Sequence, residues 1–365
     1  MKKGVYIISD RVYSSTDEGN GIYKKINSQI KAFTELGCEC TLLNLPFPKG
    51  NFFSTFIRYN RKKVYPKIDF SGIDFVYIRR IVPNNRSFNF LLYKMKKENP
   101  EMKIIYEIPT YPYDSELKGF RGKVVLFIDK WYRKRLNRYI DFITTYGDYK
   151  TIFNIPVLTI VNGIDCASIS LKNKENLTAD IHAIVVAQYW FWHGYDRLIE
   201  GMKDYYSIPR DKKFYVNFVG EGPELSRYKA LVNKYQLDSY VKFSGKLSGS
   251  DLDRAFYDAD IAFCSLGAHR KKLYLSSELK SREYMARGLP IVSSVSIDVI
   301  PNDYKYWLKF AEDDSNVCID DIISFCGKIY KNETKKEVSL AIREFVEKKC
   351  DMKIVVKSIV DKIFQ

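Results

Sequence analysis

Histidine and paired cysteines are scarce in this sequence of 365 residues. It has three histidines, and its seven cysteines follow no spacing typical of a zinc site or of a disulfide framework. The absences argue against a zinc centre and favour buried, reduced thiols. We therefore expect no metal and no other cofactor.

Long apolar runs are also missing. No stretch approaches the roughly 20 apolar residues of a membrane span. The start, Met-Lys-Lys, imitates a signal peptide, but the apolar run that follows covers only Val5–Ile8. No helix-turn-helix, zinc-finger or RNP signature points to nucleic acid. We expect a cytoplasmic protein that binds no nucleic acid.

The strongest compositional signal is positive charge. The formal net charge is +15 at pH 7. The partners that suit this charge are nucleic acid, an anionic membrane and phosphorylated small molecules. Three runs that mix basic with aromatic residues lie in the first half, at 56–63, 78–86 and 120–139.

The stretch 120–139 has the pattern of a helix that lies on a membrane surface. An apolar stripe falls on one helical side, and it consists of Phe120, Val124, Phe127, Trp131 and Leu136. A cationic flank follows the stripe, and it consists of Lys130, Arg133, Lys134, Arg135 and Arg138. Such a helix is attracted to anionic lipid, so we expect peripheral attachment to the inner face of the cell membrane. The alternative is an ordinary helix that packs its stripe on a sheet.

Short β-type runs alternate with helical patterns along the chain. Strands are expected at 4–9, 74–81, 102–109 and 157–165, and helices at 22–37 and 123–140. A polar stretch, 165–180, suits a linker, and a second series begins with the strand 181–187. Repeated β-α units predict an α/β fold with parallel sheets. We expect domains at 1–167 and 168–345, and a C-terminal helix, 346–365, that packs back toward the first domain.

Four segments of the second half occur in a telling order. They are "HGYD" (193–196) after an aromatic turn, "VGEGPE" (219–224), "VKFSGKL" (241–247) and "EYMARGLPIV" (283–292). Each alone is typical of an ordinary turn or helix end. Together with "VNGID" (161–165) they resemble glycosyltransferase family 4, retaining enzymes that use nucleotide sugars. The resemblance implies GT-B architecture, in which two Rossmann-like parallel-sheet domains face each other across a cleft. The first domain binds the acceptor and the second the donor.

The resemblance also implies donor-binding residues at matching positions. The family places an Arg and, five residues on, a Lys against the donor diphosphate, and here these positions hold Gln188 and His193. We expect His193 to contact phosphate with partial positive charge near neutral pH, at a helix N-terminus that favours anions. The alternative is a packing residue in an aromatic turn. The other expected donor contacts are Gly19, Gly21, Gly220, Glu221 and Lys242.

Cations that replace the missing Arg and Lys are expected in 267–284, and they are His269, Arg270, Lys271, Lys272 and Lys280. A solvated charge run is the alternative. The family's pair of glutamates falls on Glu283 and Leu275, so the pair is half missing, and Glu278 lies nearby but out of register. Glu283 is expected to accept hydrogen bonds from the ribose hydroxyls. Because fixed donors that face a leaving diphosphate lower the barrier, we predict His193, Lys280 and Glu283 as the catalytic residues.

The acceptor side is expected at "YEIPTYPYDSE" (106–116), with Glu107, Thr110 and Asp114 as candidate contacts, although its two prolines also suit a merely rigid loop. The expected function is retaining transfer from a nucleotide diphosphate sugar, a UDP-sugar first, to a glycan or polyprenol-linked acceptor in surface polysaccharide biosynthesis. The departures at Gln188, His193 and Leu275 keep a non-catalytic nucleotide- or glycan-binding protein open. A nucleic-acid-binding protein, the third hypothesis, would show a steep salt dependence.

Overall fold

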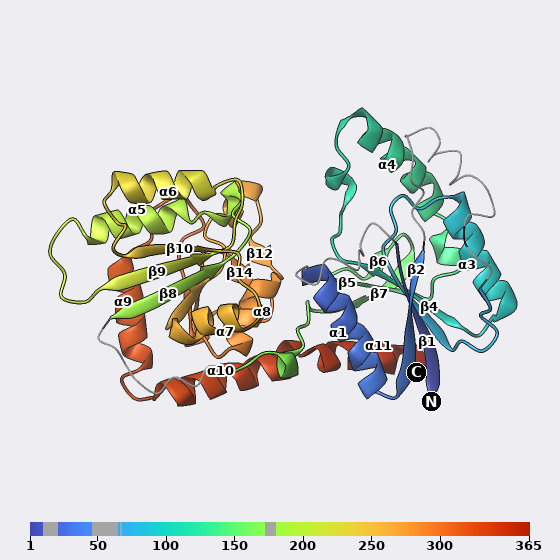
Figure 1. Cartoon of the computed structure of the whole chain (residues 1–365). Coiled ribbons are helices and arrows are strands. Elements are labelled where there is room, and N and C mark those ends of the chain that lie inside the picture. Colours follow the sequence, from blue (N-terminus) through green and yellow to red (C-terminus); the bar gives the residue numbers. More distant parts are fainter. Residues whose placement is uncertain (10–20, 46–64, 66–67, 172–179) are drawn as a thin grey trace. The chain divides into compact units, whose positions relative to one another are not determined.

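The computed structural model of the chain describes residues 1–9, 21–45, 65, 68–171 and 180–365 (Figure 1). The chain divides into two compact units. Unit 1 comprises Met1–Asn162 and Met352–Gln365, and unit 2 comprises Gly163–Asp351. The predicted ranges put the first boundary a few residues later, at 167/168, and the second a few residues earlier, at 345/346.

Unit 1 is built on a seven-stranded sheet in the order β2-β1-β3-β4-β5-β7-β6. All neighbouring strands are parallel except β6 and β7. The strands are β1 (Lys2–Ser9), β2 (Cys38–Leu45), β3 (Phe75–Arg79), β4 (Lys103–Ile108), β5 (Phe142–Thr145), β6 (Thr151–Ile152) and β7 (Ile155–Thr159). The helices are α1 (Gly21–Glu35), α3 (Arg86–Glu98), α4 (Gly119–Arg133) and α11 (Met352–Phe364), with short 3-10 turns η1 (Asp114–Glu116) and η2 (Leu136–Arg138).

Both faces of the unit 1 sheet are covered, which explains why β1 is a continuous apolar run. Val5 and Ile7 pack on the side of α3, while Tyr6 and Ile8 pack with α1 and α11. Val356 and Ile359 of α11 belong to this second cluster. The last helix of the chain is therefore part of the unit that the chain begins with.

Helix α4 differs from its sequence-based prediction. It begins at Gly119 rather than at residue 123, and it ends at Arg133. The residues after it form the turn η2, in which Leu136 is buried, so Leu136 is not part of an exposed stripe. Figure 1 shows α4 standing clear of the unit 1 sheet.

Unit 2 has a six-stranded parallel sheet in the order β10-β9-β8-β11-β13-β15. Its strands are β8 (Ile181–Val186), β9 (Phe214–Val219), β10 (Val241–Gly245), β11 (Ile261–Phe263), β13 (Ile291–Ser293) and β15 (Trp307–Lys309), and a separate pair joins β12 (Leu275–Ser276) to β14 (Ser296–Ile297). The helices are α5 (Asp196–Tyr205), α6 (Leu225–Lys234), α7 (Gly249–Asp258), α8 (Leu279–Ala286), α9 (Ile319–Ile329) and α10 (Lys335–Cys350), with turns η3 (Cys166–Ser168), η4 (Phe191–His193) and η5 (Ala268–Lys271).

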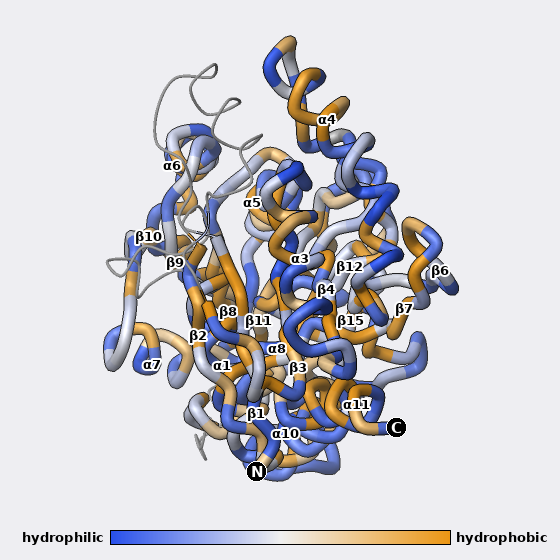
Figure 2. Tube along the Cα trace, turned by 90° about the vertical axis from the view of Figure 1, so that its right-hand side faces the viewer, coloured by the Kyte–Doolittle hydropathy of each residue, from blue (hydrophilic) through white to orange (hydrophobic). Residues whose placement is uncertain are grey.

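The strand order of unit 2 is that of a dinucleotide-binding Rossmann fold, which reverses direction between its first and fourth strands. These strands are β8 and β11, and they are neighbours in the sheet. The apolar residues of β8 and β9, orange in Figure 2, form one core with α5, α6 and α9. The predicted pair of Rossmann-like domains is confirmed, and their placement across a shared cleft stays a prediction.

Candidate functional site

A pocket opens at the point in unit 2 where the strand order reverses. In open α/β sheets the loops after the two strands diverge at this point and leave a crevice for a ligand. The pocket has a volume of about 410 Å³ and is called the switch-point pocket below. It is lined by Val186, Ala187, Gln188, Trp192, His193, Ser265, Ala268, Lys271, Leu273, Ser276, Glu278, Leu279 and Lys280.

Two glycines fix the loop that follows β8 from one side. Gly220 has φ of +127°, and a Cβ on it would lie 2.0 Å from the Ala187 carbonyl oxygen. Gly222 has φ of +152°, and a Cβ on it would lie 2.4 Å from the Tyr189 nitrogen. The loops approach closely enough for the Tyr189 N–H to donate to the Glu221 carbonyl over 2.7 Å. The "VGEGPE" segment therefore shapes the pocket through its backbone, which is a role that only glycine permits.

The other side of the same loop is fixed by a second pair of glycines. Gly194 has φ of +67°, and a Cβ on it would lie 2.5 Å from the Gly267 nitrogen. The Leu266 N–H donates to the His193 carbonyl over 2.7 Å. The loop after β8 is thus held between two neighbouring loops by direct backbone contact.

His193 lies in the pocket but differs from the expected charged contact. Burial and then the ammonium of Lys280 lower the pKa of His193 to about 3, and Lys271 adds to this against the opposing hydrogen bond to the Gln188 carbonyl. The imidazole is therefore neutral at physiological pH, and the expectation of partial positive charge is wrong. The Trp190 N–H donates to His193 Nδ1 over 3.3 Å, so the ring braces its own loop.

Two ammonium groups supply the positive charge of the pocket. Lys280 donates to the Tyr195 hydroxyl over 3.2 Å and lies 3.5 Å from Glu278. The Nζ of Lys271 lies 3.0 Å above the centre of the Trp192 ring. Both lysines came from the predicted cationic segment, 267–284.

Two of the other predicted cations are engaged elsewhere, and the third, Lys272, is exposed and does not line the pocket. Arg270 donates to both carboxylate oxygens of Asp196 over 2.9 Å and to Asp314 over 2.7 Å, and these hydrogen bonds raise its pKa against the effect of burial. His269 lies 3.2 Å from the same Asp314. Arg270 and His269 therefore tie η5 to α5 and to the loop after β15, and neither lines the pocket. The expectation that they bind phosphate is not supported by this geometry.

Glu278, which sequence reasoning left out of register, is the carboxylate that lines the pocket. It accepts from the Ser265 hydroxyl over 3.0 Å and from the Ser265 N–H over 3.4 Å. Glu283 instead pairs with Arg287 over 3.3 Å, one turn along α8. Of the three predicted catalytic residues, His193 and Lys280 line the pocket and Glu283 does not.

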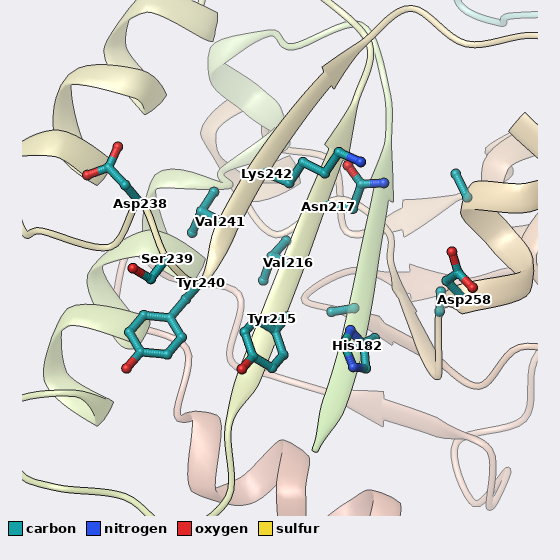
Figure 3. Close-up of a pocket in the computed structure, with 13 residues that line it drawn as sticks. His182, Tyr215, Val216, Asn217, Asp238, Ser239, Tyr240, Val241, Lys242 and Asp258 are labelled. Atoms are coloured by element: carbon teal, nitrogen blue, oxygen red, sulfur yellow. The ribbon is translucent and has the colours of Figure 1, made fainter. Parts of the chain in front are cut away.

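Lys242 lies in a different pocket, on the face of β8, β9 and β10 (Figure 3). Its neighbours there include Asn217 and Tyr215, and none of the switch-point residues takes part. Glu221 is exposed and pairs with Lys246 over 3.2 Å. Lys242 and Glu221, which were expected to contact the donor, therefore both lie outside the lining of the switch-point pocket.

The acceptor-side candidates in unit 1 do not form one surface. Glu107 is fully buried, and its carboxylate lies 3.1 Å from Lys25 and 3.0 Å from Arg79. Burial would raise the pKa of Glu107, but these two cations outweigh it and lower the pKa to about 2. Asp114 pairs with Arg133 over 2.7 Å, and Thr110 is exposed. Glu107 is therefore a structural residue, and the expectation of an acceptor contact is wrong.

The loop after β1, in which Gly19 and Gly21 were expected to contact the donor, lies mostly outside the described residues. Gly21 is the first residue of α1, and Gly19 lies outside the described residues, as does the basic run 56–63. Sequence reasoning also missed Ser265 and the partners of Glu107. The sequence gives one indication of a partner for Glu107, which is the basic residue Arg79 at the end of the otherwise apolar strand β3.

The described part of the chain holds no group of three or more His, Cys, Asp or Glu side chains that could bind a metal ion. Within the same ranges, no helix combines the length and the apolar character needed to cross a bilayer. All seven cysteines are free thiols.

Comparisons with known proteins agree with this geometry. Residues 181–324 match the family described as glycosyl transferases group 1. No curated protein matches the chain in sequence. A glycosyltransferase from Rickettsia africae is 12% identical with a TM-score of 0.64, over 99% of this chain and 97% of that one. HepE from Anabaena, solved in complex with UDP and glucose, is 10% identical with a TM-score of 0.63, over 100% and 99% of the two chains.

A third similar structure is sucrose-phosphate synthase from Thermosynechococcus elongatus, at 13% identity and a TM-score of 0.59, over 99% of this chain and 98% of that one. At such identities the likeness establishes the fold, while the family match rests on the sequence of unit 2. The matched residues contain the entire switch-point pocket. The chain thus has the GT-B fold of these glycosyltransferases, and residues 181–324 of its second unit match the glycosyl transferases group 1 family.

Proposed function

We propose that this chain transfers a sugar from a nucleotide diphosphate sugar to a glycan or lipid-linked acceptor, with retention of configuration. A UDP-sugar is the favoured donor. The observation that carries the proposal is the switch-point pocket, where two ammonium groups and a carboxylate surround a volume of about 410 Å³. Cations suit a diphosphate, and a carboxylate suits sugar hydroxyls. The UDP bound in HepE supports the choice of base to test first.

In this proposal each pocket residue has a separate task. Negative charge develops on the diphosphate as the donor bond breaks, and Lys280 faces that charge. Neutral His193 contributes position rather than charge, because it braces the loop that lines the pocket with Gln188 and Trp192. Glu278, held by Ser265, accepts hydrogen bonds from the donor sugar. No metal and no other cofactor takes part in the proposed reaction.

The test is release of free nucleotide from a panel of UDP-, GDP- and dTDP-sugars. We expect slow release from one donor class, accelerated by acceptor, and a loss of at least tenfold in Lys280→Met. Lys331→Met removes an exposed cation outside the pocket and is the matched control. Tight binding with no turnover of any donor would instead establish the alternative, a binding protein that kept the fold.

For the acceptor, we propose a lipid-linked intermediate reached through α4. An ordinary surface helix buries its apolar stripe, yet Asp129 is the one buried side chain that α4 contributes among its described residues. Phe120, Phe127 and Trp131 are 82%, 71% and 57% exposed. The spacing of these three places them on the helix side opposite Asp129.

The inward side of α4 centres on the buried carboxylate of Asp129, with Val125 and Leu126 half-buried beside it. Asp129 accepts from the Asn84 N–H and from the Tyr113 hydroxyl, both over 2.8 Å, and lies 3.3 Å from Arg133. The aromatic residues of the predicted stripe therefore face outward, which supports the membrane-facing interpretation over the packing-helix alternative. Lys123 and Lys134 are exposed beside that stripe.

Aromatic residues flanked by lysines suit the headgroup region of an anionic bilayer. We infer that the protein acts in the cytoplasm, attached peripherally to the inner membrane face, in surface polysaccharide biosynthesis. The reduced state of its cysteines is in keeping with that compartment.

A further inference from the structure

Three side chains of the switch-point pocket and its loop form an ordered stack. The rings of Trp190 and Trp192 lie 5.0 Å apart at an interplanar angle of 3°. The ammonium of Lys271 lies over the Trp192 ring, 3.0 Å from its centre. One indole thus supports the other, and the second supports a cation, which is a favourable arrangement because the face of an indole is electron-rich.

The stack joins two loops that come from different strands. Trp190 directly precedes η4 and Trp192 lies within it, in the loop after β8, and Lys271 ends η5 in the loop after β11. The backbone contacts of Gly194 with Gly267 hold these loops together. Lys271 is an exposed residue, and its contact with the Trp192 ring restricts an ammonium that would otherwise sample many rotamers.

The ammonium of Lys271 acts on the interior of the pocket. Trp192, Lys271 and His193 all line it. Lys271 and Lys280 both help to lower the pKa of His193, so the charge of each lysine reaches the ring between them. Both lysines therefore present positive charge to this part of the pocket.

The chain needs such a cation because the usual sources are missing. Position 188 is a glutamine, and position 193 is a histidine that is neutral. Arg270 forms ion pairs with Asp196 and Asp314. Lys280 shares its charge with Glu278, which lies 3.5 Å away. A diphosphate in this pocket carries about two negative charges and calls for a second cation.

We propose that Lys271, held on the Trp192 ring, is that second cation and binds the diphosphate of the donor. The proposal rests on the proposed function, since it assumes that the donor occupies the switch-point pocket. Trp192 is the positioning residue and Lys271 the binding residue. A cation placed in advance costs little ordering when the ligand arrives, which strengthens its contact with the diphosphate.

The test compares binding of UDP, uridine and inorganic pyrophosphate by calorimetry. Lys271→Met keeps most of the aliphatic stem on Trp192 and removes the charge. It should weaken UDP and pyrophosphate about tenfold or more and leave uridine unchanged, because a hydrogen bond to a charged group is lost. Lys271→Arg should retain most of the affinity for UDP. Lys272→Met, a change at the adjacent exposed lysine, is the matched control and should bind all three ligands like wild type.

Trp192 is tested through the same ligands. Trp192→Phe keeps an aromatic face and should bind UDP nearly as wild type does, whereas Trp192→Leu should lose a few-fold to tenfold. Equal affinity of Lys271→Met and wild type for UDP would overturn the proposal and leave the proposed function intact. If wild type bound neither UDP nor pyrophosphate, both would be overturned together. Equal losses in Lys271→Met and Lys272→Met would also overturn it, because they would indicate general surface charge.

Discussion

The backbones of Gly194 and Gly267 touch across two loops, with room for no further atom between them: a Cβ on Gly194 would lie 2.5 Å from the Gly267 nitrogen. Gly194 also has φ of +67°, which favours glycine. Substitution at this position therefore has two separable costs, conformational strain and collision. The chain offers a control for the first, because Gly245 has the same φ and nothing within 4 Å of its missing Cβ.

We predict that Gly194→Ala destabilises the protein more than Gly245→Ala does. The strain of a left-handed alanine costs about 1–2 kcal/mol at either position. At Gly194 the collision adds to it and moves the loop that carries His193. Chemical denaturation should show the larger loss for Gly194→Ala, and UDP titration should show weaker binding only there. Similar losses in the two variants would contradict the close-packed loop pair.

The pH dependence of donor binding should be flat. His193 has a pKa of about 3 in the folded protein, so it does not titrate between pH 6 and pH 8.5. Titration with a UDP-sugar, whose diphosphate carries no proton that titrates in this range, should give the same affinity at both ends. Affinity that falls as pH rises past 7 would indicate a charged imidazole and contradict the structure.

The same histidine should make stability depend on pH. Its folded pKa is depressed from the usual 6.5 to about 3, so the unfolded chain binds more protons between these values. The contribution of His193 is therefore fully favourable above pH 6.5 and is lost as pH falls toward 3. His193→Asn should reduce the fall in stability between pH 6.5 and pH 4. An identical pH profile in the variant would assign the fall to other groups.

Glu107 should affect stability rather than acceptor use. It is buried against Lys25 and Arg79, and Glu107→Gln leaves both cations without their carboxylate. Breaking a buried ion pair in this way costs about 3–5 kcal/mol. The pKa of Glu107 is lowered to about 2, so its contribution is present above its unfolded pKa of 4.5 and is lost as pH falls toward 2. Wild-type stability with a changed KM for acceptor would show that Glu107 contacts the acceptor after all.

The two glutamates of the α8 region should separate by ligand. Glu278 lines the pocket, while Glu283 pairs with Arg287. Glu278→Gln should weaken a UDP-sugar more than UDP, because its carboxylate faces the sugar in our proposal. Glu283→Gln should bind UDP and its 2′,3′-dideoxy analogue like wild type, whereas a loss of about tenfold for UDP alone would show that Glu283 accepts from the ribose hydroxyls. Equal binding of both nucleotides would identify Glu283 as a structural helix residue.

Membrane attachment is tested on the exposed face of α4. Lys123→Glu with Lys134→Glu should abolish sedimentation with anionic vesicles, since each basic residue contributes about 1 kcal/mol and reversal doubles the loss. Arg133 is left unchanged because it pairs with Asp114 and Asp129. Lys331→Glu with Lys336→Glu makes the same charge change in unit 2 as a control. Sedimentation that persists in the α4 variant would exclude this helix as the attachment site.

The fold was largely predictable because β-α alternation is a local signal. The runs at 4–9 and 181–187 correspond closely to β1 and β8, and glycines at 220, 222 and 288 mark the turns. Side-chain partners were not predictable, since they depend on contacts between distant loops. Arg270 and Lys271 are adjacent basic residues that the sequence does not distinguish. In the structure Arg270 forms ion pairs with Asp196 and Asp314, whereas the ammonium of Lys271 lies over the Trp192 ring.

Glu107 illustrates the same limit in unit 1. A glutamate near the end of a strand suggests a site, and only the structure brings Lys25 from α1 and Arg79 from β3 to it. The neutral state of His193 likewise follows from burial and from Lys280, neither of which a motif specifies. Motif positions therefore located the pocket, whereas charge states and pairings required the packed loops.

Backbone hydrogen exchange with and without a saturating UDP-sugar shows whether the donor occupies the switch-point pocket. We predict slower exchange in the loops 187–195 and 264–280, with no change on the strand face that carries Tyr215 and Lys242. Protection confined to that strand face, or unchanged exchange in both loops despite saturation, would contradict the account.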